Sequence, residues 1–267
     1  MQKVKALKRF GQNYLTDSNI INKIISEFSP QPNDNLIEIG PGLGALTEKL
    51  LEKARLLTSV EIDRRVIDQL RKKYPQLNLI NADFLELDLS ELLINKNEKL
   101  RIIGNIPYNL TSPILFKMIE SNEIIKDSVL TVQLEVAKRI TAKKGTKDYG
   151  ILAVLMQHFA DIKFNFKVSP NVFYPKPKVY SAVIHLFFKE NCLKEEEKKY
   201  FIKIVKASFG NRRKTLKNSL SNSIFSTVNF LDSEIDLTLR AEQLDVEDFV
   251  RLTKFTLANN RQSLLNI

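Results

Sequence analysis

Residues 36–47 read LIEIGPGLGALT, and this stretch decides the fold. Its first four residues form a short apolar run that predicts a strand, and residues 45–54 have the amphipathic spacing of a helix. The three glycines between them allow the backbone to turn sharply and to approach a ligand closely. With the alanine that follows, they satisfy the G-x-G-x-x-G/A pattern of nucleotide-binding turns. The stretch therefore predicts a strand, a ligand-binding turn and a helix, in that order.

The alternation of strand and helix continues on both sides of this turn. Upstream, Asp17 is expected to cap a helix that runs to Phe28, and far downstream Asp245 and Asp248 are expected to begin the last helix. Strands that alternate with helices at this spacing are typical of a parallel, doubly wound sheet. The run at 179–188 alternates like a strand and is expected to lie antiparallel to its neighbours. Further strands are expected at 56–62, 77–80, 100–104 and 127–134, and further helices at 64–74, 112–121 and from about residue 135.

Two segments in the second half of the chain mark a change of pattern. The proline-rich segment at 169–178 cannot be a helix or a central strand, and the charged connector at 189–199 opens a helical remainder. We therefore expect an α/β domain at residues 1–190 and a small all-helical domain at residues 191–267.

Acidic residues follow the second and third predicted strands. Glu61 ends its strand about twenty residues after the glycines, where an acid that binds a ribose belongs. Asp83 offers an acceptor to an adenine amino group, beside the flat apolar side chain of Phe84. The glycine turn alone fits a nicotinamide or flavin dinucleotide as well as S-adenosylmethionine. The third acid, and the lack of a second glycine turn after residue 100, favour S-adenosylmethionine.

The sequence Asn105-Ile106-Pro107-Tyr108 follows the fourth predicted strand, at the same edge of the sheet. An aromatic amine such as that of adenine is a poor nucleophile, because its lone pair is delocalised into the ring. The side-chain oxygen of Asn105 and the carbonyl of Pro107 can accept hydrogen bonds from such an amine, and Tyr108 can stack on the base. These residues therefore predict a cradle for a planar amine that receives a methyl group.

The charge of the chain indicates its partner. There are 41 Lys and Arg against 31 Asp and Glu, a formal net charge of +10, which favours nucleic acid first and an anionic membrane second. The cations are clustered, and the last cluster is expected to occupy about one and a half turns of a basic helix. The residues expected to contact RNA are Lys8, Arg9, Lys143, Lys144, Lys176, Lys178, Arg212, Arg213, Lys214 and Lys217.

The few cysteine and histidine residues exclude several kinds of site. Cys192 is the single cysteine, so no internal disulfide is possible and the cytoplasm is the expected location. His158 and His185 have no partners at metal-ligand spacing, so no metal is expected. No apolar run approaches the ~20 residues that a membrane helix requires. We therefore expect no membrane association.

Taken together, these residues closely resemble the KsgA/RsmA family of ribosomal RNA adenine dimethyltransferases, over nearly the whole chain. The family's N-terminal motif is matched by KRFGQNYL at 8–15, its cofactor turn by EIGPGLGALT at 38–47 and its catalytic motif by NIPYN at 105–109. The resemblance implies a Rossmann-like class I S-adenosylmethionine-dependent methyltransferase domain with a small C-terminal all-helical domain. It implies cofactor contacts from Gln12, Asn13, Leu15, Gly40, Gly42, Glu61, Ile62, Asp83, Phe84 and Asn105.

The resemblance also implies how the target is held and what the reaction is. Asn105, Pro107 and Tyr108 would hold the target amine, and Phe173 would stack on the other face of the base. The implied reaction is the dimethylation of two adjacent adenosines in the 3′-terminal hairpin loop of 16S rRNA, late in small-subunit maturation, with S-adenosylhomocysteine as product. The enzyme is expected to be a monomer. Tyr180 departs from the family, which usually has an acid at this position.

Several other proteins fit parts of the sequence. Erm-type enzymes, which methylate 23S rRNA, share NIPY and a similar proline-rich loop, but residues 209–220, FGNRRKTLKNSL, resemble the KsgA branch. A non-catalytic assembly factor on the same fold would be expected to have lost Gly40, Glu61 or Asn105, and all three are present. A nicotinamide oxidoreductase would need a second nucleotide-binding half. DNA adenine methyltransferases more commonly carry an acidic D-P-P-Y motif.

Overall fold

The computed structural model describes residue 7 and residues 11–190 and 193–265, with side chains described up to residue 259. The chain forms two compact units. The first contains the residues up to Ala137 together with Ala160–Lys189, and the second contains Lys138–Phe159 together with the residues from Glu190 onward. The break after Lys189 lies one residue before the boundary that is expected from the sequence. The segment Lys138–Phe159, however, groups with the C-terminal residues and not with the α/β domain.

The first unit is built on a large sheet and a separate pair of short strands. In chain order the strands of this unit are β1 (Tyr14–Leu15), β2 (Asn35–Ile39), β3 (Leu56–Glu61), β4 (Asn78–Asn81), β5 (Leu100–Asn105), β6 (Ile125–Gln133), β7 (Ala160–Val168), β8 (Phe173–Tyr174) and β9 (Ser181–Phe188). The helices are α1 (Ser18–Phe28), α2 (Ala45–Leu51), α3 (Arg64–Lys73), α4 (Thr111–Glu120) and α5 (Leu134–Ile140), the last of which continues into the second unit.

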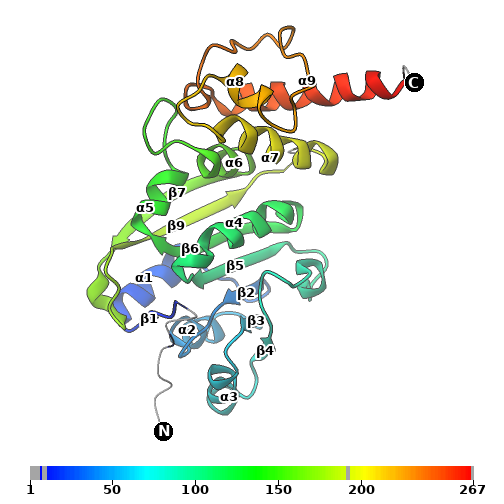
Figure 1. Cartoon of the computed structure of the whole chain (residues 1–267). Coiled ribbons are helices and arrows are strands. Elements are labelled where there is room, and N and C mark those ends of the chain that lie inside the picture. The colour runs from blue at the N-terminus through cyan, green and yellow to red at the C-terminus, as the bar shows by residue number, and fades with distance from the viewer. Residues whose placement is uncertain (1–6, 8–10, 191–192, 266–267) are drawn as a thin grey trace. The chain divides into compact units, whose positions relative to one another are not determined.

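The order of the strands is that of a doubly wound sheet. The 7-stranded sheet runs β4-β3-β2-β5-β6-β9-β7, and β1 pairs separately with β8 (Figure 1). Strands β2 to β6 are parallel, whereas β9 is antiparallel to both β6 and β7. The predicted α/β fold class and the antiparallel direction of the strand near residues 181–188 are confirmed. Because β2 to β5 are parallel, their carboxyl ends lie at one edge, and the loops that follow them meet there.

The sequence analysis missed β7, which it left between a helix and the proline-rich segment. This strand reads ADIKFNFKV, and a register shift between Phe164 and Phe166 interrupts its period of two. It lies at the end of the sheet and pairs with β9 only, so much of it is exposed. A charged strand at a sheet edge needs no continuous apolar run, which is why hydrophobic patterning does not reveal it.

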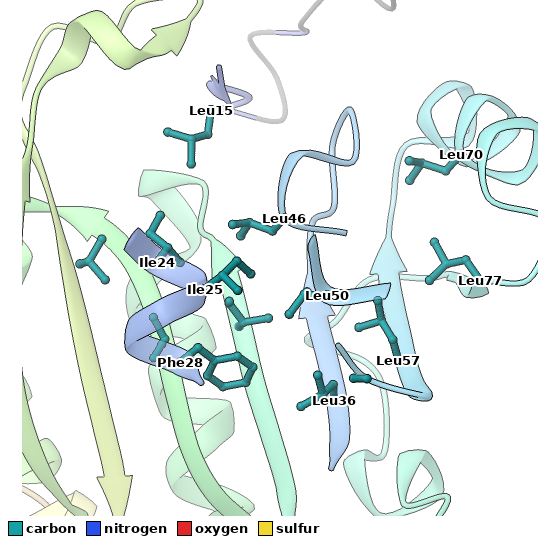
Figure 2. Packing of buried hydrophobic residues seen from close by; sticks show 14 of the residues in the cluster. Leu15, Ile24, Ile25, Phe28, Leu36, Leu46, Leu50, Leu57, Leu70 and Leu77 are labelled. Atoms are coloured by element: carbon teal, nitrogen blue, oxygen red, sulfur yellow. The ribbon is translucent and has the colours of Figure 1, made fainter. Parts of the chain in front are cut away.

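The core of the first unit packs helices α1 and α2 against the sheet. In Figure 2, Ile24, Ile25 and Phe28 of α1 point toward the strands, and Leu46 and Leu50 of α2 lie beside them. All five side chains are buried. Phe28 follows Ile24 and Ile25 by four and three residues, and Leu50 follows Leu46 by four, which places them on one face of each helix. Burial of each such side chain contributes about 1.5–3 kcal/mol. As predicted, the Asp17 carboxylate caps α1 by accepting hydrogen bonds from the first helical N–H groups.

A buried carboxylate on the strand before the glycine turn is hydrogen-bonded to the helix that follows the turn and to the next strand. Glu38 of β2 is 1% exposed, and one of its oxygens accepts hydrogen bonds from the hydroxyls of Thr47 (2.7 Å) and Ser59 (2.8 Å). These two hydroxyls belong to α2 and β3, so Glu38 ties the helix after the turn to two strands of the sheet. Burial raises the pKa of Glu38 to about 7, although both hydroxyl hydrogen bonds oppose the rise.

Replacing Glu38 with Gln tests this arrangement. The unfolded chain releases the Glu38 proton near the ordinary glutamate pKa of 4.5, and the folded chain releases it near a pKa of about 7. Stability therefore falls as pH rises between those values, by about 1.4 kcal/mol per pH unit from this group. We expect Glu38→Gln, which keeps an acceptor but cannot ionise, to flatten that fall in a series of melting temperatures. Glu91→Gln, at an exposed position, should leave the slope unchanged. An unaltered slope in Glu38→Gln would contradict the account.

The second unit is helical and has an aromatic core. Its helices are α6 (Ile151–Phe159), α7 (Glu195–Phe209), α8 (Leu216–Ser221) and α9 (Val246–Leu265). The rings of His158 and Phe159 lie with centroids 4.6 Å and 6.0 Å from that of Phe201 on α7. Burial of this face of α6 against α7 is the physical reason why residues 138–159 belong to this unit. Asp245 and Asp248 exchange backbone-to-carboxylate hydrogen bonds at the start of α9, as predicted.

The second histidine of the chain, His185, is buried and contacts a carboxylate. His185 is 5% exposed, and its Nε2 lies 2.7 Å from a carboxylate oxygen of Asp127, which also receives the guanidinium of Arg101. Among the described residues, no cluster of three or more His, Cys, Asp or Glu could hold a metal ion. Within the same residues, no helix is both long and apolar enough to cross a membrane. Cys192, Lys8 and Arg9 lie outside the described residues.

Candidate active site

A cavity of about 230 Å³ opens at the carboxyl edge of the parallel strands. Its walls come from the segment before β1, from the turns after β2, β3 and β4, and from the loop after β5. The sequence analysis assigned most of these residues to the cofactor or to the target base. The lining residues are Gly11, Gln12, Asn13, Tyr14, Ile39, Gly40, Gly42, Val60, Glu61, Ile62, Ala82, Asp83, Phe84, Leu85, Asn105, Ile106, Pro107, Tyr108, Asn109, Leu110 and Ile114.

Two glycines shape the wall that follows β2. Gly40 and Gly42 have φ angles of +63° and +54°, a conformation that favours glycine. A Cβ atom at Gly40 would meet nothing within 4 Å, so this backbone faces open space in the cavity. A Cβ atom at Gly42 would lie 2.8 Å from the ring of Tyr14, so close packing also requires this glycine. A ligand can therefore approach the turn to within contact distance of the backbone.

Glu61 is the buried acid of the cavity. Its carboxylate accepts hydrogen bonds from the backbone N–H of Asp63 at 2.9 Å and, over a longer 3.4 Å, from that of Gly42. Burial raises the pKa of Glu61 above its ordinary value, although these N–H groups act in the opposite direction. The carboxylate keeps further lone pairs, so it can accept hydrogen bonds from the vicinal hydroxyls of a ribose. The predicted position of an acid at the end of β3 is thus consistent with the geometry.

The cavity is also lined by a second acid and by two apolar side chains. Asp83 lines the cavity, and one of its carboxylate oxygens accepts a hydrogen bond from the N–H of Leu85, at 2.9 Å. Phe84 is buried, whereas Ile62 is 45% exposed at the rim. An acceptor and apolar side chains in one cavity suit a planar, amino-substituted ring such as adenine. The residues present therefore fit the nucleoside of S-adenosylmethionine, and the ribose contact of Glu61 stays a prediction.

The amide of Asn105 has a fixed orientation. Its Nδ2 donates a hydrogen bond of 2.7 Å to the main-chain carbonyl of Asn13, which lies 92 residues earlier. Because an amide has its oxygen opposite its nitrogen, this bond directs Oδ1 away from Asn13. The segment that carries Asn13 is anchored in turn, since Gln12 Nε2 donates to Asp63 at 3.1 Å. The N-terminal segment is thus part of the active site.

The rest of the NIPY segment is anchored to the sheet at two points. The N–H of Ile106 donates to the carbonyl of Thr131 on β6 at 3.1 Å, and the Tyr108 hydroxyl lies 2.7 Å from the hydroxyl of Ser181 on β9. The Pro107 carbonyl accepts from the N–H of Leu110 at 2.9 Å, and its second lone pair remains for a ligand. Burial raises the pKa of Tyr108, so this phenol is neutral at physiological pH.

Two predicted site residues do not reach the cavity. Leu15 and Phe173 are 6% and 4% exposed and belong to the hydrophobic core, where they face each other across the β1–β8 pair. The exposed aromatic residue of that strand is Tyr174, at 67%. The backbone alternation of β8 explains the difference, because neighbouring side chains point to opposite faces. A role of Phe173 in stacking on the target base stays a prediction.

The cavity also contains residues that the sequence analysis did not single out. Tyr14 packs its ring against Gly42, and burial together with the charges of Glu61 and Asp63 raises its pKa to about 12. Asn109, like Tyr14, stands inside one of the quoted motifs, so its place in the motif could have identified it. Ile114, on α4, could not have been identified in this way, because the sequence does not distinguish an apolar helix residue that lines a cavity from one in the core.

Comparison with known proteins identifies the family. Residues 3–257 match the protein family described as ribosomal RNA adenine dimethylase. The chain belongs to this family. The fold class, the enzyme class and the cofactor predicted from the sequence are thereby confirmed: the protein is an S-adenosylmethionine-dependent ribosomal RNA adenine dimethyltransferase. Its partner is ribosomal RNA.

Several named RNA-modifying enzymes are similar to this chain. The chain is 45% identical to the ribosomal RNA small subunit methyltransferase A of Chlorobium phaeobacteroides, over 92% of each chain. It is 43% identical to the protein of the same name from Francisella tularensis subsp. novicida, over 95% of this chain and 98% of that one. A dimethyladenosine transferase of Plasmodium falciparum superposes with a TM-score of 0.78 at 27% identity, over 93% and 98% of the two chains. The 23S rRNA methyltransferase ErmE superposes with a TM-score of 0.65 at 28% identity, over 91% and 99%.

The basic clusters of the dimethylase are placed differently from the prediction. Arg212, Arg213 and Lys214 lie in the turn between α7 and α8, and only Lys217 is helical, so the expected continuous basic helix is wrong. Helix α7 ends at Phe209, and Gly210 begins the turn with right-handed helical angles, φ −56° and ψ −31°. All four side chains are exposed, as are Lys143, Lys144, Lys176 and Lys178. Exposure makes most of these cations accessible to RNA phosphates, whereas Lys144 already forms an ion pair with Asp245 at 3.0 Å.

Arg212 differs from its neighbours because its guanidinium is engaged within the second unit. It donates to the carboxylate of Glu242 at 2.9 Å and to the carbonyls of Tyr149, at 3.1 Å, and Lys147. These bonds hold the basic loop of residues 143–149 in place. Among the described residues, no ion pair involves Arg213 or Lys214. We expect phosphate contacts from the latter two and a structural role for Arg212.

Single and double alanine variants separate these roles. Arg212→Ala should lower the free energy of unfolding by about 1–2 kcal/mol, because several charge-assisted hydrogen bonds are lost from a partly exposed site. The double variant Arg213→Ala, Lys214→Ala should keep the wild-type melting temperature. Its binding to ribosomal particles should depend less on salt, with a slope smaller by about one per removed cation. Equal effects of the two variants on both measurements would contradict the assignment.

Proposed function

We propose that the dimethylase acts on two adjacent adenosines in the 3′-terminal hairpin loop of 16S rRNA. The substrate would be a late precursor of the small ribosomal subunit, and the enzyme would work in the cytoplasm as a monomer. The observation that carries the proposal is the convergence of three glycine- or acid-bearing turns and the NIPY segment on one cavity. The names of the relatives, which refer to the small subunit, support the choice of RNA.

The cofactor supplies an electrophilic methyl group on a sulfonium. Transfer forms an N–C bond at the adenine amine, breaks the S–C bond and releases one proton from that amine to water. The residues of this chain supply position and hydrogen-bond acceptors. Asn105 Oδ1, directed away from Asn13, accepts one N–H of the target amine. The free lone pair of Pro107 O accepts the other. Both bonds raise the electron density of the amine nitrogen and orient its lone pair.

Tyr108 stacks on the face of the base and keeps its amine at these acceptors. Its ring is half-buried, and the bond of its hydroxyl to Ser181 leaves it little freedom to rotate. A base that has left the RNA stack loses its stacking partners, and an immobilised ring replaces one of them. After the first transfer the amine has one N–H left, so one acceptor suffices for the second transfer. The new methyl group replaces an N–H that faced the other acceptor oxygen, so the base must shift to give it room before the second transfer.

Methylation of 23S rRNA is the second candidate function. It is favoured by the superposition on ErmE, a 23S rRNA methyltransferase, which extends over 91% of this chain. Mass spectrometry of rRNA fragments after incubation of unmodified ribosomal subunits with labelled cofactor separates the two. Label in a 3′-terminal fragment of 16S rRNA, as two methyl groups per adenosine, is the expected result. Label in 23S rRNA alone would contradict the proposal.

Replacement of Asn105 by Ala tests the cradle. The variant loses the acceptor for the target amine, and kcat is expected to fall by about 10²-fold or more, as for other positioned catalytic groups. S-adenosylhomocysteine should still raise its melting temperature, since the glycine turn and Glu61 are intact, whereas NAD should not. Asn171→Ala, an exposed asparagine outside the cavity, should turn over normally. Near-normal turnover by Asn105→Ala on unmodified 30S particles would rule the cradle out.

A further inference from the structure

Tyr180 is an exposed aromatic residue to which the proposed function gives no role. It immediately precedes β9, and its side chain is 47% exposed. An exposed tyrosine on a basic surface can serve as a platform on which an unpaired nucleobase stacks. Single exposed apolar residues are common on proteins, so exposure alone does not indicate a binding role for Tyr180. The residues around it provide the evidence.

The backbone of Tyr180 is fixed next to the target cradle. Its carbonyl accepts the N–H of Leu134 at 2.9 Å, and the hydroxyl of the next residue, Ser181, lies 2.7 Å from that of Tyr108. Consecutive Cα atoms are about 3.8 Å apart, so Tyr180 lies one residue from the contact that holds the cradle's ring. The ring of Tyr180, which lies just before β9, contacts Lys167, the cross-strand neighbour of Ala182. The ring therefore lies on the face of Ala182 and not on that of Ser181. It is available to a nucleotide that flanks the target and not to the target base itself.

A cation already occupies one face of the Tyr180 ring. Nζ of Lys167 lies 3.6 Å from the ring centroid, and Lys167 is the cross-strand neighbour of Ala182, two residues after Tyr180. This contact limits the rotation of the ring and leaves its second face for another planar group.

Further cations lie just before Tyr180 in the chain. Lys176 and Lys178 are exposed, and none of the described residues forms an ion pair with either. In Figure 1 the connection between β7 and β9 that carries them, in yellow-green, runs beside β1 and α1 in the first unit. An aromatic ring with unpaired cations nearby matches the chemistry of single-stranded RNA, in which bases alternate with phosphates. Lysine is depleted in protein–protein interfaces, so two unpaired lysines before the ring favour RNA over a protein partner.

We propose that Tyr180 is a stacking platform for an unpaired ribosomal RNA nucleobase next to the target adenosine, with Lys176 and Lys178 as contacts to the adjoining phosphates. The inference rests on the proposed function, because it specifies how the same site recognises the RNA around its target. It assigns Tyr180 to affinity and positioning and not to the methyl transfer itself.

Three substitutions at Tyr180 distinguish stacking from simple packing. Tyr180→Phe keeps the ring, Tyr180→Leu keeps apolar volume without a ring, and Tyr180→Ala removes both. On small-subunit particles that lack the modification, we expect the Leu and Ala variants to raise KM by about tenfold, a typical effect of losing one base–aromatic stack. We expect kcat to change by less than about twofold, and Tyr180→Phe to behave as the wild type. Phe187→Ala, at an aromatic residue of β9 that is 43% exposed and does not line the cavity, is the matched control and should leave KM unchanged.

The dependence of KM on salt separates the ring from the cations. Stacking releases no counterions, so Tyr180→Ala should weaken binding equally at low and high salt. Lys176→Ala combined with Lys178→Ala should instead reduce the salt slope by about two. S-adenosylhomocysteine should raise the melting temperature of every variant as it does that of the wild type.

Three results would overturn the inference. The first is a wild-type KM in Tyr180→Ala, the second is a wild-type KM in Tyr180→Leu, and the third is loss of the response to S-adenosylhomocysteine in Tyr180→Ala, which would show a structural role. The wild-type enzyme gives the independent control for the proposed function. If it methylates 16S rRNA and the Tyr180 variants do so with an unchanged KM, only the present inference fails. If the wild type does not methylate 16S rRNA, the proposed function fails as well.

Discussion

The hydrogen bond from Asn105 to the main-chain carbonyl of Asn13 is the constraint on which the active site depends. A free asparagine amide can present either its oxygen or its NH₂ group to a ligand, and only the oxygen can accept hydrogen bonds from an amine. The Asn13 carbonyl, itself only an acceptor, fixes that choice. Because the partner is a backbone atom, no substitution of the Asn13 side chain removes it, and the position of the N-terminal segment decides whether the amide is correctly turned.

This dependence explains why so many contacts hold the N-terminal segment on the first unit. Gln12 bonds to the cap of α3 at Asp63, Tyr14 packs on Gly42, and β1 pairs with β8. The residues that hold the cofactor side of the cavity therefore also hold its target side. Glu61 bonds to the same residues, Asp63 and Gly42, that anchor Gln12 and Tyr14. The parallel strands bring these groups to one edge of the sheet, and the N-terminal segment forms the remaining part of the cavity lining.

Much of this could be predicted from sequence, because the decisive features are local. The glycine turn, Glu61, Asp83 and the NIPY segment each follow a strand directly, and parallel strands place such residues together without further information. What sequence could not provide depends on contacts between distant segments. The burial of Phe173 and Leu15 follows from the pairing of β1 with β8, and the engagement of Arg212 follows from a loop more than sixty residues earlier. The edge strand β7 was missed since its exposed, bulged sequence carries no apolar period.

The central claim is that Asn105 Oδ1 and Pro107 O receive the target amine. The most direct measurement is a crystal structure of the enzyme with S-adenosylhomocysteine and adenosine. The account predicts that the adenosine amine nitrogen lies at hydrogen-bond distance, about 2.7–3.2 Å, from both oxygens, with Asn105 Nδ2 still on the Asn13 carbonyl. An amide turned so that Nδ2 faces the amine, or an adenosine bound away from residues 105–108, would contradict it.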